Sequence, residues 1–480
     1  MRLSRIATTS VACAAAFALA ACSTGSDPEP AASQEPTGPS LRMLVDGTPA
    51  EVDALQAEVD AWSEDSGSSV RIVLASDLEQ QLAESFANAN PPDVFALSTT
   101  MLERYDGYLE AYGRLATADD LVPWLLDAVA SGGELQCAPR SVDATMLAIS
   151  EDAWAEAGLG DGDVPTTWEQ LEAIGARLTT DDRAGLAIDP DAAHLGVLLA
   201  QAGGTLVDEA GAAADSPENV AALDLVQRMV EAETLAWPAD LDAGSAAEAL
   251  ATGDAAMAYV DLEALLAAEA AAPAPSEEPS EEPGEGSDPD APAGSAEPSA
   301  TQDPAASDDP AASASPSTSP SATAEDDADQ DDAEQDATDA SSLLEGVRLV
   351  PLPVGPANGA TFATATCWAL PADTRTGDEA RDLVAALLEP EAQVALADAT
   401  GTVPVTTSGG TAFAEAHPER APVVDAVASA TSLETALGPQ EATDALDETL
   451  ATLASAGVEA DAPALLAELQ ERLEQQLDEG

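Results

Sequence analysis

Three short apolar runs near the start of the chain alternate with helical patterns, and this alternation limits the fold more than any other feature. The runs are residues 41–45, 70–74 and 93–97. Thr48 and Glu51 form a capping box before the first helical pattern, in which apolar residues recur on one helix face. Strands that alternate with helices at this spacing form a parallel sheet with right-handed crossovers. The sequence therefore predicts a βαβαβ unit.

The first 22 residues have the layout of a secretory signal. Arg2 and Arg5 precede a run of small and apolar residues, 6–21, which is too short to span a bilayer comfortably. Leu-Ala-Ala-Cys at 19–22 resembles the bacterial lipobox, and this resemblance implies cleavage before Cys22 and attachment of lipid to it. We therefore expect a signal peptide (1–21), a lipid anchor and a flexible linker (22–40). The alternative is an ordinary secreted protein with a chance cysteine.

Residues 271–340 differ sharply from the rest of the chain. They include 20 acidic residues and 11 prolines, but no basic, aromatic or large aliphatic residue. Because it has nothing to bury, such a segment cannot offset the entropy of ordering, and we predict a disordered acidic insertion in a surface loop. Asp327, Asp329 and Asp331 alternate as in a calcium loop, but Asp332 stands where that loop needs glycine. We predict no metal site there.

Charge and cysteines limit the partners and the compartment. The formal net charge of −75 excludes nucleic acid and anionic lipid as partners and repels anionic solutes. Beyond the signal and Cys22 only Cys137 and Cys367 remain, and outside the cytoplasm such a pair is most simply a disulfide. Two free thiols are the alternative.

Six segments of the chain carry a resemblance to a known family. They are residues 92–95 (Pro-Asp-Val-Phe), 155–159 with 165–171 (Ala-Glu-Ala-Gly-Leu, then Pro-Thr-Thr-Trp-Glu-Gln-Leu), 201–206 (Gln-Ala-Gly-Gly-Thr-Leu), 249–257 (Ala-Leu-Ala-Thr-Gly-Asp-Ala-Ala-Met), 351–356 (Pro-Leu-Pro-Val-Gly-Pro) and 401–405 (Gly-Thr-Val-Pro-Val). In type and order they resemble the extracellular solute-binding lipoproteins of ABC importers, in the carbohydrate group that includes maltose-binding protein. Leu250 departs from the family pattern, which has Phe at this point.

The resemblance implies an α/β, two-lobed periplasmic-binding-protein fold of type II. In this fold two mixed sheets flanked by helices are joined by hinge strands around a central cleft. We expect residues 41–142 and 360–410 in the first lobe, and residues 143–270, 341–359 and 411–480 in the second. The acidic insertion then interrupts the second lobe. By the same resemblance, Cys137 and Cys367 lie on neighbouring hinge strands.

Candidate ligand-binding residues come from this layout and from the chemistry of sugars. Open sheets bind ligands beyond the carboxyl ends of their strands, which selects Asp46, Asp77 and Ser98, with Ser76 and Thr99 beside them. The resemblance places Arg140 and Asp143 on the first crossing strand and Trp368 on the returning strand.

Aromatic faces and planar polar groups hold sugars, so we also select two further aromatic residues. Trp237 lies in a Trp-Pro loop, and Tyr259 follows the Ala-Ala-Met element. The family's Gly-x-Trp is absent after Tyr259, where Val-Asp-Leu stands at 260–262. That departure puts the usual stacking platform, and a sugar as the solute, in question.

No catalytic site or cofactor is predicted. Only two histidines exist, His194 and His417, and neither has metal-ligand spacing. The serine-hydrolase and zinc-protease motifs are absent.

We predict a monomeric, lipid-anchored receptor on the outer face of the cell membrane. It captures a small uncharged or cationic solute, a saccharide, and delivers it to ABC permease subunits. The alternatives are a degenerate surface lipoprotein with a structural or adhesive role and a receptor for a non-sugar solute.

Overall fold

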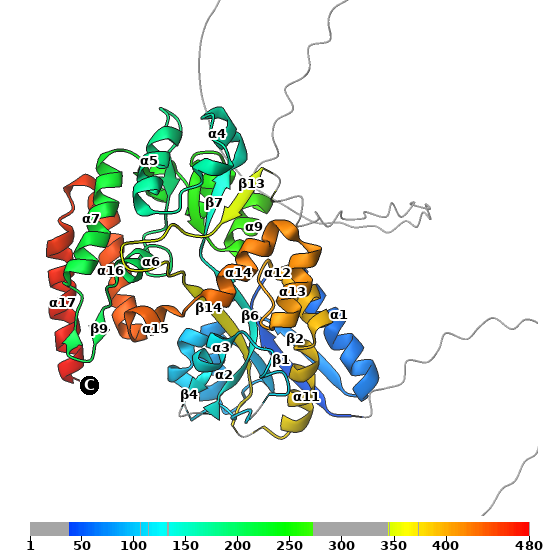
Figure 1. The fold of residues 1–480 in the computed structure, drawn as a ribbon. Coiled ribbons are helices and arrows are strands. Elements are labelled where there is room, and N and C mark those ends of the chain that lie inside the picture. Colours follow the sequence, from blue (N-terminus) through cyan, green and yellow to red (C-terminus); the bar gives the residue numbers. More distant parts are fainter. Residues whose placement is uncertain are drawn as a thin grey trace, which may run out of the picture.

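The computed structural model describes residues 38–271 and 344–479, apart from residues 106, 114, 132, 133, 345 and 373. The predicted signal peptide, the lipid site at Cys22, nearly all of the linker and the acidic insertion lie outside the described residues. Within these ranges the chain forms two five-stranded sheets, each covered by helices (Figure 1).

The first sheet has the strand order β2-β1-β3-β14-β6. Its strands are β1 (Ser40–Val45), β2 (Ser69–Leu74), β3 (Val94–Ser98), β6 (Cys137–Ala144) and β14 (Ala363–Ala369). Strand β1 pairs in parallel with both β2 and β3, which confirms the predicted βαβαβ unit, and β14 runs antiparallel between β3 and β6. The capping box of Thr48 and Glu51 is present at the start of α1 (Pro49–Ser66).

The second sheet has the strand order β11-β8-β12-β7-β13. Its strands are β7 (Met146–Ser150), β8 (Leu186–Ala187), β11 (Leu235–Ala236), β12 (Met257–Val260) and β13 (Val347–Val350). Strand β7 is antiparallel to β12 on one side and to β13 on the other, while β8 is parallel to β11 and β12. Both sheets are therefore mixed, as the two-lobed α/β prediction requires. Two short hairpins complete the strands: β4 (Ala130–Ser131) with β5 (Glu134–Leu135), and β9 (Val207–Asp208) with β10 (Gly211–Ala212).

Helices divide between the two lobes. Those of the first lobe are α1, α2 (Leu78–Ala87), α3 (Pro123–Ala128), α11 (Gly377–Leu387), α12 (Pro390–Thr400), α13 (Thr407–Ala416) and α14 (Ala421–Ser429). Those of the second lobe are α4 (Glu151–Glu156), α5 (Trp168–Leu178), α6 (Gly196–Ala202), α7 (Pro217–Glu231), α8 (Ala246–Ala251), α9 (Leu262–Ala271), α15 (Leu433–Leu437), α16 (Gln440–Ala456) and α17 (Ala462–Glu479). Within the described ranges, no helix is both long and apolar enough to cross a bilayer.

The chain crosses between the lobes on short connections. Only Thr145 separates β6 in the first sheet from β7 in the second, and residues 351–362 lead back from β13 to β14. A further crossing at residues 430–432 joins α14 to α15.

This last crossing corrects the predicted boundary at residue 410. His417, just after α13, lies 2.7 Å from Asp398 of α12, and Val423 and Val427 of α14 share a buried cluster with Val403. Residues 411–429 therefore pack with the first lobe. The six-motif resemblance ended at residue 405, so it gave no guide to the boundary.

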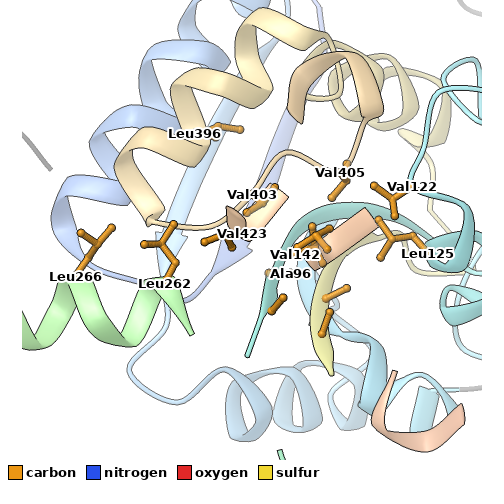
Figure 2. Packing of buried hydrophobic residues seen from close by; sticks show 14 of the residues in the cluster. Ala96, Val122, Leu125, Val142, Leu262, Leu266, Leu396, Val403, Val405 and Val423 are labelled. Carbon is orange, nitrogen blue, oxygen red and sulfur yellow. The ribbon is translucent and has the colours of Figure 1, made fainter. Parts of the chain in front are cut away.

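The lobes also touch through an apolar contact. Leu262 and Leu266 of α9 lie beside Leu396 and Val423 of the first lobe in one buried cluster (Figure 2). Gly401, which has φ +74°, fits beneath α9, because a Cβ atom there would lie 2.7 Å from Leu266 Cδ1. One side of the hinge is therefore closed by close packing.

Candidate functional site: a polar pocket between the lobes

A pocket of about 210 Å³ lies between the two lobes. It begins where β3 ends, because the carboxyl ends of parallel strands β1, β2 and β3 meet at the same sheet edge and the chain there turns into a 3-10 helix. Its first-lobe lining residues are Thr99, Thr100, Leu102, Asp127, Ala128 and Ala130. Its second-lobe lining residues are Ser432, Glu434, Thr435, Pro439 and Gln440.

Larger hollows exist, but each belongs to one lobe. A hollow of about 300 Å³ lies beside Arg42 and α2, and another of about 490 Å³ lies beside Arg183 and α4. A ligand in either would contact one lobe and could not join the two. The pocket below α15 is therefore the candidate site, although it is smaller.

Hydroxyl groups on the first-lobe rim are already fixed in place. The Ser98 and Thr100 hydroxyls lie 2.9 Å apart, and Ser98 Oγ also caps the short helix that follows β3. Thr99 Oγ1 donates to the carbonyl of Ala365 on β14 at 3.1 Å, so the rim is tied to a hinge strand. The predicted pair Ser98 and Thr99 therefore lies at the pocket, Thr99 in its lining and Ser98 next to it.

The second-lobe rim is a helix start. Ser432 caps α15 by accepting a hydrogen bond from the Thr435 amide at 3.2 Å, and its hydroxyl lies 3.0 Å from Thr435 Oγ1. We did not select any residue between 430 and 440 from the sequence. The available signal was the Ser-Leu-Glu-Thr start of a short helix, which is common and says nothing about ligands.

The lining combines polar and apolar side chains, and its charged groups in the described residues are carboxylates. Asp127 and Glu434 face it from opposite lobes, and neither forms an ion pair with a described residue. None of the described residues that line it is basic or aromatic. The pocket therefore offers hydroxyl, amide and carboxylate groups, and no ring on which a sugar could stack.

Three predicted residues meet at the hinge, outside the pocket lining. Arg140 Nη1 lies 3.6 Å from Asp46 Oδ1, and the guanidinium of Arg140 lies 4.9 Å from the ring centroid of Trp368. Trp368 is fully buried in the first-lobe core. Arg140 therefore links the end of β1 to the hinge strands β6 and β14.

The aromatic predictions are not met. Trp237 is 4% exposed and Tyr259 is fully buried, and both pack in the core of the second lobe, as Trp368 does in the first. None of the three rings reaches the pocket. Asp77 is also apart from it, because its carboxylate accepts a hydrogen bond from the Gln80 amide at 2.9 Å and caps α2.

Asp143 belongs to a buried polar cluster behind the hinge. Its carboxylate accepts a hydrogen bond from the Glu263 amide at 2.8 Å, which ties β6 to the start of α9. Burial, and then the charge of Asp261, hold the pKa of Asp143 well above its ordinary value.

His194 joins the same cluster from the second lobe. Its Nδ1 lies 2.9 Å from Asp191 and its Nε2 lies 3.6 Å from Asp261. Burial alone would lower its pKa, but hydrogen bonds and charge from these two aspartates raise the pKa to about 10. His194 is therefore an imidazolium held between carboxylates.

Glu263 faces both lobes from the first turn of α9. Loss of water around its carboxyl group, and then the charges of Asp261 and Glu51, raise its pKa to about 7, although the side chain as a whole remains accessible to solvent. Arg140 opposes this rise and Asp46 adds to it.

Among the described residues, no group of three or more His, Cys, Asp or Glu side chains is placed to hold a metal ion.

Cys137 and Cys367 form a disulfide between β6 and β14. Both are fully buried in a cluster that includes Phe95 and Tyr105. The bond therefore lies on the neighbouring strands that the resemblance implied, inside the first lobe.

Comparison with known proteins decides the family. The sequence model of the family described as bacterial extracellular solute-binding protein matches residues 47–394. The chain belongs to this family. No curated protein sequence matches this solute-binding protein.

Solved structures share the fold of this solute-binding protein. One is the GacH receptor of Streptomyces glaucescens, solved unliganded and with acarbose, with a TM-score of 0.67, 15% identity, and coverage of 92% of this chain and 98% of that chain. Another is the cyclic α-maltosyl-1,6-maltose binding protein of Arthrobacter globiformis, with a TM-score of 0.65, 18% identity, and coverage of 92% and 100%. A third is UgpB of Mycobacterium tuberculosis in complex with glycerophosphocholine, with a TM-score of 0.65, 16% identity, and coverage of 92% and 99%.

Proposed function

We propose that this solute-binding protein is the lipid-anchored, extracellular substrate-binding subunit of an ABC importer. It captures a small hydroxylated solute, of the saccharide class, between its lobes and delivers it to the permease without catalysing a reaction. The observation that carries the proposal is the pocket below α15, whose lining comes from both lobes and is rich in hydroxyl groups. Related structures of the same fold hold acarbose and other solutes.

The location follows from the sequence and the family. The lipobox-like segment ending at Cys22 supports attachment to the outer face of the membrane. Cell fractionation tests this part, because a Cys22→Ser variant should move from the membrane fraction to the medium. If the variant stays in the membrane fraction, the anchor is not at Cys22.

Binding is tested by thermal shift and calorimetry with monosaccharides, disaccharides and polyols. A solute that binds only the native state at 100 times its Kd should stabilise it by about 2.7 kcal/mol. Thr435→Val should weaken that binding, because it removes a pocket hydroxyl. Thr452→Val, at an exposed position on α16, is the matched control and should bind as the native chain does.

One observation favours a second candidate. The part of the pocket lining that the structure describes has no aromatic residue, and this is what a receptor for a non-sugar solute, or a degenerate surface protein, would also show. A full panel that leaves the melting temperature unchanged would support the degenerate surface protein and contradict the importer role.

A further inference from the structure

We infer that the pocket takes a small hydroxylated solute carrying a free, protonated amine, of the class of amino sugars and amino polyols. This inference rests on the proposed function of the pocket and names the chemistry of its solute. It is carried by the two carboxylates of the described lining, Asp127 and Glu434, which face the pocket from opposite lobes beside hydroxyl and amide groups.

The two carboxylates of the pocket have no cationic partner among the described residues. Asp127 comes from the end of α3 and Glu434 from α15, so the two carboxylates approach from opposite lobes. Neither forms an ion pair with a residue in the described ranges. An ammonium group placed between the lobes can donate hydrogen bonds to both carboxylates, and such charge-assisted bonds are about twice as strong as neutral ones.

The same lining disfavours other solute classes. Phosphates, sugar acids and amino acids carry an anionic group, and the described lining includes no Arg, Lys or His to receive it. Quaternary ammonium compounds are recognised by aromatic cages, and no aromatic side chain is among the described residues that line the pocket. Neutral sugars find hydroxyl partners but no stacking face.

Hydroxyl and amide groups account for the rest of the recognition. Thr99, Thr100, Ser432 and Thr435 present hydroxyls, and Gln440 presents an amide. Thr99 donates its hydroxyl proton to the Ala365 carbonyl and Ser432 donates its own to Thr435, so these two hydroxyls can accept hydrogen bonds from a sugar ring. The Thr435 hydroxyl and the Gln440 amide can also donate. At about 210 Å³ the pocket is below the roughly 300–1,000 Å³ that encloses a drug-sized ligand, so it suits a single ring better than an oligosaccharide.

Calorimetry with three matched probes tests the inference: glucosamine, glucose and N-acetylglucosamine. They differ at one ring position, which carries an ammonium, a hydroxyl or an amide. We expect glucosamine to bind about tenfold more tightly than the other two, since a charged hydrogen bond exceeds a neutral one by about that factor. Added sodium chloride should reduce this preference.

Charge-removing variants locate the effect. Asp127→Asn and Glu434→Gln should each reduce the ratio of glucosamine affinity to glucose affinity severalfold. Asp182→Asn, which removes an exposed carboxylate on a second-lobe loop away from the pocket, is the control and should keep the full preference. Circular dichroism and the melting temperature of each variant establish that it is folded.

The possible outcomes separate this inference from the proposed function. Binding of glucose with no preference for the amine overturns the inference and leaves the proposed function standing. A glucosamine preference that survives in both pocket variants also overturns it, because the amine is then recognised elsewhere. Absence of binding across neutral and amine probes overturns both.

Discussion

Opening the disulfide between Cys137 and Cys367 should destabilise the protein in a way that depends on which lobe unfolds. The two cysteines are 230 residues apart, and the intervening chain includes every strand of the second sheet. If the whole chain unfolds at once, the bond constrains an unfolded loop of that length. The chain-entropy model then gives a loss of about 5 kcal/mol in the free energy of unfolding on reduction.

A different value follows if the lobes unfold separately. While the second lobe stays folded, it holds the ends of β6 and β14 near β7 and Phe362, so the constrained loop is only about 15 residues and the loss falls to about 3 kcal/mol. Unfolding of the second lobe alone should be unaffected by reduction, because strand pairing in the folded first lobe already holds Cys137 and Cys367 together.

Guanidinium chloride unfolding followed by fluorescence and circular dichroism measures these values. The oxidised protein, the reduced protein and a Cys137→Ala/Cys367→Ala variant should be compared, because reduction keeps both sulfur atoms while the variant removes them. We expect the reduced protein and the variant to unfold at lower denaturant with a larger m-value, since their unfolded chains are less constrained. Equal midpoints for the oxidised and reduced proteins would refute this reasoning.

Three further predictions concern stability. His194→Asn should lower the free energy of unfolding by about 3 kcal/mol at pH 6, because it leaves Asp191 and Asp261 without their charged partner. The difference in the free energy of unfolding between the native protein and this variant should shrink as the pH rises from 6.5 to about 10. Urea unfolding across this pH range measures the difference, and a pH-independent difference would contradict the prediction. The pKa of Glu263 is raised from 4.5 to about 7, so the free energy of unfolding should fall by about 1 kcal/mol, after screening by solvent, as the pH rises between these values. Glu263→Gln should remove this dependence of the free energy of unfolding on pH. A variant with the same dependence as the native protein would show that another group titrates. Leu446→Ala, in the second-lobe core, should cost about 3 kcal/mol in thermal unfolding, whereas Leu477→Ala, at a half-exposed position, should cost little; equal losses would contradict the packing described here.

The part of the first sheet formed by β1, β2 and β3 could be predicted because its signals are local, whereas β6 and β14 were placed only through the family resemblance. Each strand of the βαβαβ unit follows its neighbour along the chain, and the capping box at Thr48 marks where the first helix begins. The second sheet could not be derived in this way. Strand β13 pairs with β7 from almost 200 residues away, and β8 and β11 have only two residues each. Its presence was predicted only through the family resemblance.

The aromatic candidates were misplaced for a reason that lies in the composition. Only 3% of the residues are aromatic, although 45% are hydrophobic, so small side chains make up much of the apolar surface. Cores built from small residues need the few large rings to fill space at native density. The core therefore buries Trp237, Tyr259 and Trp368. In a chain richer in large aliphatic residues, those residues could fill the core and leave aromatic rings available to line a cleft.

The two sides of the hinge differ in chemistry, and this difference determines how a solute can act on the lobes. Where α9 meets Gly401 and Leu396, apolar side chains already exclude water and leave no room for a ligand. Where α15 faces Thr99 and Asp127, the groups are polar and still accessible. A solute shifts an equilibrium between conformations only through contacts that differ between them. If the pocket between α15 and the first lobe is the solute site, as we propose, closure of the lobes is driven by hydrogen bonds and charge there. A solute that cannot bond to both rims then binds without changing the relation between the lobes.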